Sequence, residues 1–149
     1  MIETIIEALS YHGRLQAEVE KKENMKEIVD NNELERWTFG INTNQLVELV
    51  LEGKKTATTY LYEDNEKYKE NDISILTDIN GNDVCLIQTK KIIITTFKNI
   101  TWDLAVLEGE NNSLDDWRKE HYNFFKKIKP DFNKDTKVVF EIFEMIDKL

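Results

Sequence analysis

The sequence contains few residues that could cross-link the chain or ligate a metal: one cysteine and two histidines among 149 residues. A single cysteine excludes an internal disulfide. Cys85 lies in the apolar stretch 84–87, so we expect a buried, inert thiol. The cysteine and the two histidines, His12 and His121, are too scattered to indicate a zinc site. We therefore predict neither a metal nor a cofactor.

Long hydrophobic runs are also missing. No segment approaches the length of a transmembrane helix, and residues 1–10 lack the basic flank and apolar core of a signal peptide. The chain has one proline and no visible repeat or low-complexity tract. These absences predict a cytoplasmic protein with no membrane partner.

The sequence has fewer basic than acidic residues. The 20 lysines and arginines are outnumbered by 29 acidic residues, which gives a formal net charge of −9. This balance disfavours a protein that binds duplex nucleic acid through its phosphates. A nucleic-acid ligand must therefore be a nucleoside, a nucleotide or a short single strand, or must meet a local basic patch. The oligomeric state does not follow from the sequence.

The apolar pattern predicts one α+β domain over residues 1–149, with a curled β-sheet or β-barrel and peripheral helices. Helical spacing in residues 1–34 indicates a mainly helical N-terminal extension, which we expect to pack on the barrel. A helix is expected over 44–52. The β-rich segments from 56 to 97 have no helix between them, which favours antiparallel pairing through short turns.

A second helical region follows the β-rich part. Ser113 is expected to cap a helix, because two acidic residues occupy the first turn after it. The inner face of this helix is expected to include Trp117, His121 and Ile128. On that face His121 is predicted to be a packed, hydrogen-bonded histidine rather than a catalyst.

The most informative segment that is present runs from Gly53 to Thr59, with the sequence GKKTATT. An apolar helical pattern ends at Gly53, where a helix favours a C-terminal glycine. Lysines and hydroxyl-bearing residues follow at once. An amine and a hydroxyl beside a tight chain reversal can bind a phosphate or ribose, or can act as base and nucleophile.

Three segments together resemble the ASCH domain family, whose fold is similar to the PUA domain of RNA-modifying proteins. The first is WTFG at 37–40, and the second is GKKTAT at 53–58. The third begins with AVLEGE at 105–110 and continues through Ser113 to the aromatic residues near His121. The resemblance covers residue 35 to the C-terminus and implies a ligand-binding cleft lined by the second segment.

The resemblance also implies candidate site residues. In a hydrolytic branch of the family, the working lysine and threonine fall on Lys55 and Thr58. The working glutamate falls on Glu108 or on Glu110, and we favour Glu108 because it precedes Gly109 at an expected helix end. The other residues expected to bind the ligand are Trp37, Phe39, Gly53, Lys54, Thr56, Glu110 and Arg118.

The implied function has several forms. The leading one is a domain that binds RNA, a nucleoside or a nucleotide in the cleft. The first alternative is an amidohydrolase acting on N4-acetylcytidine-like nucleosides, with Thr58 as nucleophile, Lys55 as base and Glu108 as orienting acid; a ribonuclease activity is also described for the family. The second alternative is a partner-binding or regulatory module without chemistry.

Overall fold

The structure is a computed structural model that describes residues 34–66 and 68–149, together with Gln16 and Glu20. The chain divides into two units, Met1–Leu34 and Glu35–Leu149. The predicted helical extension therefore falls on residues outside the described part, apart from Gln16 and Glu20, which are helical and exposed. The fold and the site below belong to the second unit.

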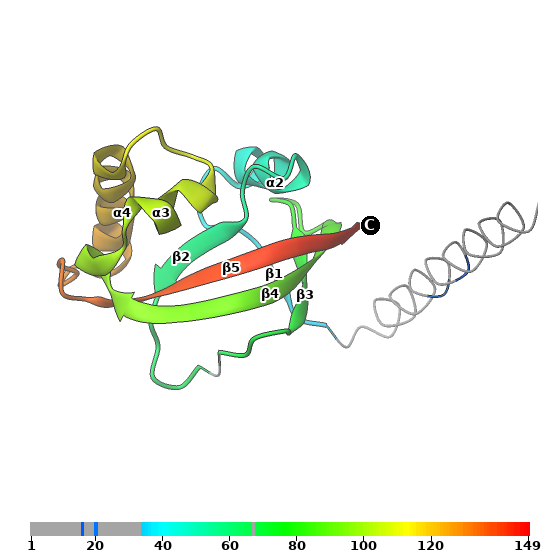
Figure 1. Cartoon of the computed structure of the whole chain (residues 1–149), viewed down its shortest axis with the longest axis horizontal. Coiled ribbons are helices and arrows are strands. Elements are labelled where there is room, and N and C mark those ends of the chain that lie inside the picture. The colour runs from blue at the N-terminus through cyan, green and yellow to red at the C-terminus, as the bar shows by residue number, and fades with distance from the viewer. Residues whose placement is uncertain (1–15, 17–19, 21–33, 67) are drawn as a thin grey trace, which may run out of the picture. The chain divides into compact units, whose positions relative to one another are not determined.

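Five strands form one mixed sheet in the order β1-β3-β4-β5-β2 (Figure 1). The strands are β1 (Arg36–Trp37), β2 (Ala57–Leu61), β3 (Ile73–Thr77), β4 (Asp83–Thr96) and β5 (Lys137–Lys148). The β1–β3 pair is parallel and the other three pairs are antiparallel. The expected antiparallel pairing through a short turn is confirmed for β3 and β4, whereas β2 pairs with the C-terminal strand β5 and not with β3.

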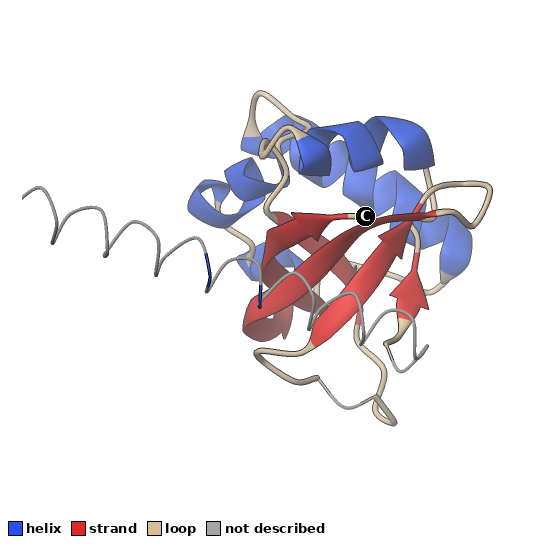
Figure 2. Ribbon diagram, turned by 90° about the vertical axis from the view of Figure 1, so that its right-hand side faces the viewer, coloured by secondary structure: helices blue, strands red, loops and turns tan. Residues whose placement is uncertain are grey.

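The long strands β4 and β5 give the sheet its curl. Their register shifts between Leu86 and Ile87 and again between Thr89 and Lys91. An extra residue in one strand bends that strand and increases its twist. Helices gather over one side of the strands, as Figure 2 shows. The structure therefore confirms the α+β class and a curled PUA-like sheet with peripheral helices.

The described helices are short except for the last. They are α2 (Thr43–Leu51), the 3-10 turn η1 (Phe97–Asn99), α3 (Trp102–Ala105), the 3-10 turn η2 (Val106–Glu108) and α4 (Leu114–Ile128). The predicted cap of α4 is confirmed, because the Ser113 side chain accepts a hydrogen bond from the Asp116 backbone N–H at 3.2 Å. This cap sets where α4 begins, and hence which of its residues reach the site.

Two apolar clusters hold the elements together. One joins α4 to β2 and β5 through Trp117, Phe125 and Phe140. The other packs α2 against the sheet through Val50 and Phe143, and contains Cys85, whose thiol is buried and free as expected. Burial raises the pKa of this thiol to about 11, which disfavours the reactive thiolate.

The inner face of α4 is shorter than predicted. Trp117 and Phe125 are fully buried, but Ile128 is 58 % exposed. The placement of Ile128 in the inner face was therefore wrong. Ile128 is the last residue of α4, and the apolar cluster against which the helix packs does not include it. In the described part of the chain, no helix is long and apolar enough to cross a membrane.

Candidate functional site

The segment after α2 is positioned by backbone hydrogen bonds. Gly53 has a φ of +75°, and this left-handed residue ends the helix as expected. The N–H groups of Lys54 and Lys55 both donate to the Leu49 carbonyl, at 2.9 Å and 3.0 Å. The next N–H, of Thr56, donates to Leu107 in η2 at 2.8 Å. The end of α2 and the turn η2 are thereby joined.

Gly109 allows this close approach. It follows η2 with a φ of +72°, and a Cβ atom built on it would lie 2.2 Å from the carbonyl oxygen of Lys54. Only glycine suits both the left-handed conformation and the contact with backbone. The consequence is that the side chains of Lys55 and Glu108, which are distant in sequence, are brought together.

Lys55 forms the centre of the site. Its side chain is 1 % exposed, and its Nζ lies 3.3 Å from Glu108 Oε1 and 2.7 Å from Glu110 Oε2. Both candidate glutamates therefore contact the same ammonium, so the sequence alternatives were not exclusive. The Phe39 ring lies on another side, with its centroid 5.5 Å from Nζ. Removing an ammonium from water is costly, and the two carboxylates offset that cost for Lys55.

The second oxygen of Glu108 has two donors of its own. Glu108 Oε2 accepts from Trp117 Nε1 at 2.6 Å and from Thr59 Oγ1 at 3.0 Å. The hydroxyl that reaches Glu108 is therefore that of Thr59, whereas we expected Thr58. Successive side chains of a strand point to opposite faces of the sheet. Thr58 and Thr59 both lie in β2, so the Thr58 side chain points away from Glu108; Thr58 pairs with Glu141 of β5.

The presence of Thr59 in the site, where we had predicted Thr58, can be tested by substitution. Thr59→Val should lower the free energy of unfolding by about 1.5–3 kcal/mol, because it removes a donor from a buried carboxylate. Thr58→Val, which removes the neighbouring hydroxyl, should change stability by less than about 0.5 kcal/mol. Urea denaturation of the two variants makes the comparison. Equal losses, or a larger loss at Thr58, would contradict the placement of Thr59 in the site.

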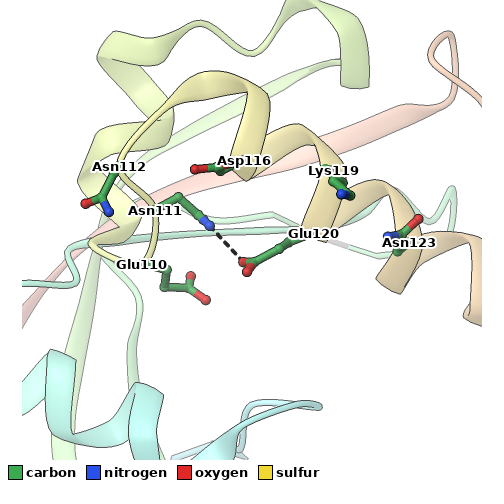
Figure 3. Close-up of a pocket in the computed structure, with 7 residues that line it drawn as sticks. All are labelled: Glu110, Asn111, Asn112, Asp116, Lys119, Glu120 and Asn123. Carbon is green, nitrogen blue, oxygen red and sulfur yellow. Dashed lines mark hydrogen bonds between the residues drawn. The ribbon is translucent and has the colours of Figure 1, made fainter.

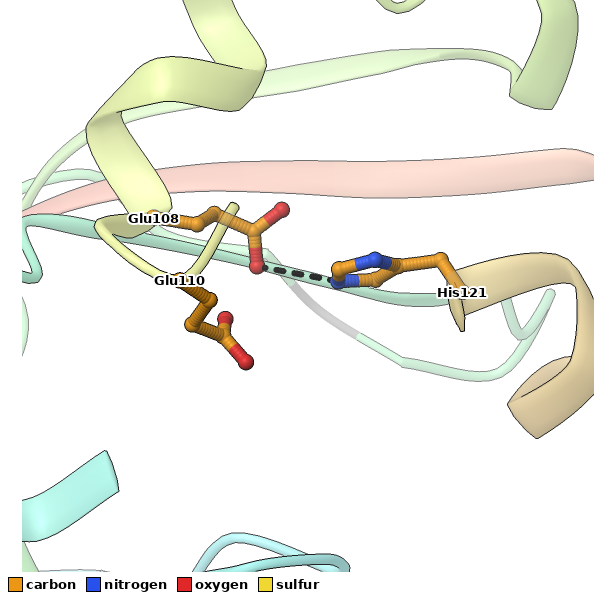
Figure 4. A group of neighbouring side chains, drawn as sticks. All are labelled: Glu108, Glu110 and His121. Carbon is orange, nitrogen blue, oxygen red and sulfur yellow. Dashed lines mark ion pairs between the residues drawn. The ribbon is translucent and has the colours of Figure 1, made fainter. Parts of the chain in front are cut away.

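His121 completes the cluster from α4. Its Nε2 lies 3.4 Å from Glu108 Oε1, the contact drawn in Figure 4. Its Nδ1 lies 2.8 Å from the Trp117 carbonyl oxygen, and its ring stacks on Trp117 with centroids 4.2 Å apart. The predicted packed, hydrogen-bonded histidine is thus found, and its second partner is the central carboxylate of Glu108. Nothing in the sequence pattern indicated that contact.

The surroundings of Glu108 favour its ionised form. Burial by itself would raise the pKa of this carboxyl, but the His121 hydrogen bond, the Lys55 charge and the Trp117 N–H outweigh it and lower the pKa to about 2. His121 shows the converse. Burial opposes its charge, while the bond to Glu108 and the nearby carboxylates raise its pKa above the ordinary value of 6.5.

Most other predicted ligand residues have structural contacts. Trp37 packs edge-on against Phe39 and donates from Nε1 to Ser74 Oγ at 2.9 Å. Phe39 is only 8 % exposed, so it forms a wall behind Lys55 and offers little surface to a base. The Lys54 side chain is 67 % exposed and pairs with Glu52.

Arg118 and Thr56 also contact backbone. Arg118 Nη2 donates to the carbonyl oxygens of Lys98 and Ile100 at 3.3 Å and 3.4 Å, next to η1. Thr56 Oγ1 donates to the Leu107 carbonyl at 3.3 Å. These contacts hold the backbone near the site, and among the described residues the Arg118 guanidinium bonds to the backbone at η1 and not to the Lys55 cluster.

A polar pocket of about 400 Å³ opens beside Glu110 (Figure 3). Its lining holds three carboxylates, three carboxamides and one ammonium. These are Glu110, Asp116 and Glu120, then Asn111, Asn112 and Asn123, and Lys119. Asn111 Nδ2 donates to Glu120 Oε2 at 2.8 Å across one wall. Glu110 is the residue shared by the pocket and the buried cluster, and hydrogen-bond acceptors predominate around the opening.

Glu108, Glu110 and His121 also offer oxygen and nitrogen atoms within 4.8 Å of one another. That spacing would suit a metal ion. However, Lys55 Nζ already contacts both carboxylates, so the cation of this cluster is the protein's own ammonium. The donor set therefore fits a metal poorly, because an ion would have to displace a buried lysine.

The curled sheet, and the site at the junction of α2, η2 and α4, define a PUA-like domain. The family model for the ASCH domain matches residues 35–147, and the chain belongs to that family. Among functionally curated proteins, none matches the chain significantly.

Solved structures agree with this assignment. The chain is similar to the ASCH domain from Lactobacillus crispatus JV V101, with a TM-score of 0.71 and 24 % identity over 76 % of this chain and 80 % of that one. It is also similar to protein EF3133 from Enterococcus faecalis V583, with a TM-score of 0.72 and 27 % identity over 86 % and 93 % of the two chains.

Proposed function

We propose that the Lys55 cluster and the adjoining pocket bind a nucleoside that carries no phosphate. The observation that carries this proposal is the position of Glu110. One of its carboxylate oxygens contacts the buried Lys55 ammonium at 2.7 Å, and the same side chain lines the pocket. A ligand in the pocket would therefore meet the cluster through Glu110. ASCH domains as a family are RNA-binding or hydrolase-like, which supports a nucleoside as the ligand class.

The charges of the pocket support a neutral ligand. Asp116 and Glu120 are opposed in the pocket lining by Lys119, while Glu110 is already paired with Lys55. Carboxylates repel a phosphate at short range, whereas they accept hydrogen bonds from ribose hydroxyls and exocyclic amines. We expected Lys54, Lys55 and Arg118 to supply positive charge, but Lys54 is paired with Glu52, Lys55 is paired with two glutamates, and none of the three lines the pocket.

A direct test compares cytidine, cytidine 5′-monophosphate and a short single-stranded RNA by calorimetric titration at two salt concentrations. Cytidine should bind with an affinity that salt leaves unchanged. The monophosphate should bind about tenfold more weakly at low salt, a repulsion of ~1.4 kcal/mol, and the difference should shrink as salt screens the carboxylates.

Glu120→Gln provides the matched variant, because Glu120 lines the pocket without joining the buried cluster. Glu120→Gln should reduce the difference in affinity between cytidine and its monophosphate. Glu48→Gln, on an exposed position of α2, should leave that difference unchanged. Tighter binding of the monophosphate would contradict the proposal. Binding of none of the three ligands would favour the partner-binding module.

One observation favours the amidohydrolase as a second candidate. Thr59 Oγ1, Glu108 and Lys55 Nζ form a hydrogen-bonded chain, and a hydroxyl, a carboxylate and an ammonium are the groups that amide hydrolysis uses. Lys55 Nζ is engaged in two ion pairs, however, and the lowered pKa of Glu108 makes that carboxylate a weak base. Incubation with N4-acetylcytidine, followed by chromatography, should show no cytidine if binding is the function. Release of cytidine, abolished by Thr59→Val, would select the hydrolase.

A further inference from the structure

The geometry around His121 determines where its protons lie. Its Nδ1 is 2.8 Å from the Trp117 carbonyl oxygen, which can only accept, so Nδ1 carries a proton. Its Nε2 is 3.4 Å from Glu108 Oε1. A neutral ring protonated on Nδ1 would direct a lone pair at that carboxylate. Since Glu108 accepts from Lys55, Thr59 and Trp117 and is ionised, the imidazolium is the form that suits both contacts.

The cluster is electrically balanced only in this form. Lys55, from the segment before β2, and His121, from α4, supply two positive charges. Glu108, at the end of η2, and Glu110, in the loop that follows, supply two negative charges. In the described part of the chain, the aromatic rings next to His121 are those of Trp117 and Phe125, which carry no charge. Loss of one proton from His121 leaves an unbalanced negative charge in a buried site, which is costly.

We propose that His121 is a positioning residue that holds Glu110 in place for the ligand, by sharing with Lys55 the task of neutralising Glu108. When His121 is neutral, the Lys55 ammonium becomes the one remaining cation for both carboxylates. Glu108 is 2 % exposed and cannot gain water, whereas Glu110 is 18 % exposed and can. The ammonium then moves toward Glu108, and Glu110 is released into the pocket. The pocket loses its preorganised acceptor, and affinity falls.

This inference rests on the proposed function, and its first test does not need a ligand. The imidazole resonances of the full-length protein are titrated by NMR, with His12→Gln to assign the second histidine. We expect His121 to titrate above 6.5, and Glu110→Gln to lower that value, because Glu110 contributes to the negative surroundings. Titration of His121 at or below 6.5 would overturn the proposal.

Stability supplies a second ligand-free readout. Because the folded pKa of His121 is raised, its contribution to stability is fully present below the unfolded value near 6.5 and is lost as pH rises through the folded value. The free energy of unfolding should therefore fall across that window in the wild type. His121→Gln should flatten the profile. An unchanged slope in the variant would contradict the charge pairing.

The third arm measures binding. Cytidine affinity should be highest while His121 is protonated and should fall about tenfold as His121 loses its proton, because the pocket then loses its preorganised acceptor. In His121→Gln the affinity should be weak and independent of pH. A variant that keeps the wild-type pH profile would overturn the inference. Absence of cytidine binding at every pH would instead contradict the proposed function, so the two failures are distinguishable.

Discussion

Lys55→Met should lower the free energy of unfolding by about 3–5 kcal/mol, the cost of leaving a buried charge without its partner. The stem of the lysine would be replaced by a side chain of similar size, so packing changes little. Glu108, with 2 % of its side chain exposed, would lose the ammonium 3.3 Å from Oε1. Urea denaturation at neutral pH gives the value.

The neighbouring lysine is the matched control. Lys54 is 67 % exposed and pairs with Glu52 at the surface, so Lys54→Met should change stability by less than about 0.5 kcal/mol. The loss in Lys55→Met should also shrink at acid pH, because Glu108 without Lys55 can take up a proton. Equal effects of the two substitutions would show that Lys55 does not carry the buried ion pairs assigned to it.

Gly109→Ala should lower the free energy of unfolding by about 2–5 kcal/mol. The left-handed conformation at φ +72° accounts for roughly 1–2 kcal/mol and overpacking for roughly 1–3 kcal/mol. The atom that the new methyl group would meet is the backbone carbonyl oxygen of Lys54, at 2.2 Å, which no rotamer change can remove. Relief requires separation of η2 from the end of α2, which would also draw Glu108 away from Lys55.

Gly81→Ala separates the two contributions. Gly81 has a φ of +83°, but nothing lies within 4 Å of a Cβ atom built on it. Its substitution should cost only about 1–2 kcal/mol, the conformational share. Calorimetric melting of both variants measures the difference. If Gly109→Ala is no worse than Gly81→Ala, the close approach of the two segments is not what requires glycine at 109.

The two predictions concern the same physical feature. The fold holds Lys55 and Glu108 where water is excluded, with Glu110 at the edge of the same cluster, and it does so through backbone contacts that Gly109 permits. The ammonium and the carboxylates stabilise one another's charged forms. This arrangement leaves Glu110 as the group that both the cluster and the pocket share. Ligand recognition and stability are therefore expected to change together in variants of Lys55 and Gly109.

The sequence by itself determined the class of fold and the segments of the site. Local signals were sufficient there: β-rich segments joined by a short turn predicted the antiparallel β3–β4 pair, and Ser113 predicted the start of α4. The resemblance of three segments predicted that Lys55 would meet a glutamate near position 108. These predictions rest on short stretches of chain and on their order in the sequence, and they need no knowledge of packing.

Tertiary structure alone decided which side chains meet. A shift of one residue exchanges the faces of a strand, so the start of β2 at Ala57 brought Thr59 rather than Thr58 to Glu108. The contact of His121 with Glu108 depends on how α4 packs against η2, because His121 and Glu108 belong to different elements. Long-range electrostatics followed from the same packing, since burial and neighbouring charges, rather than residue type, determine which groups are ionised.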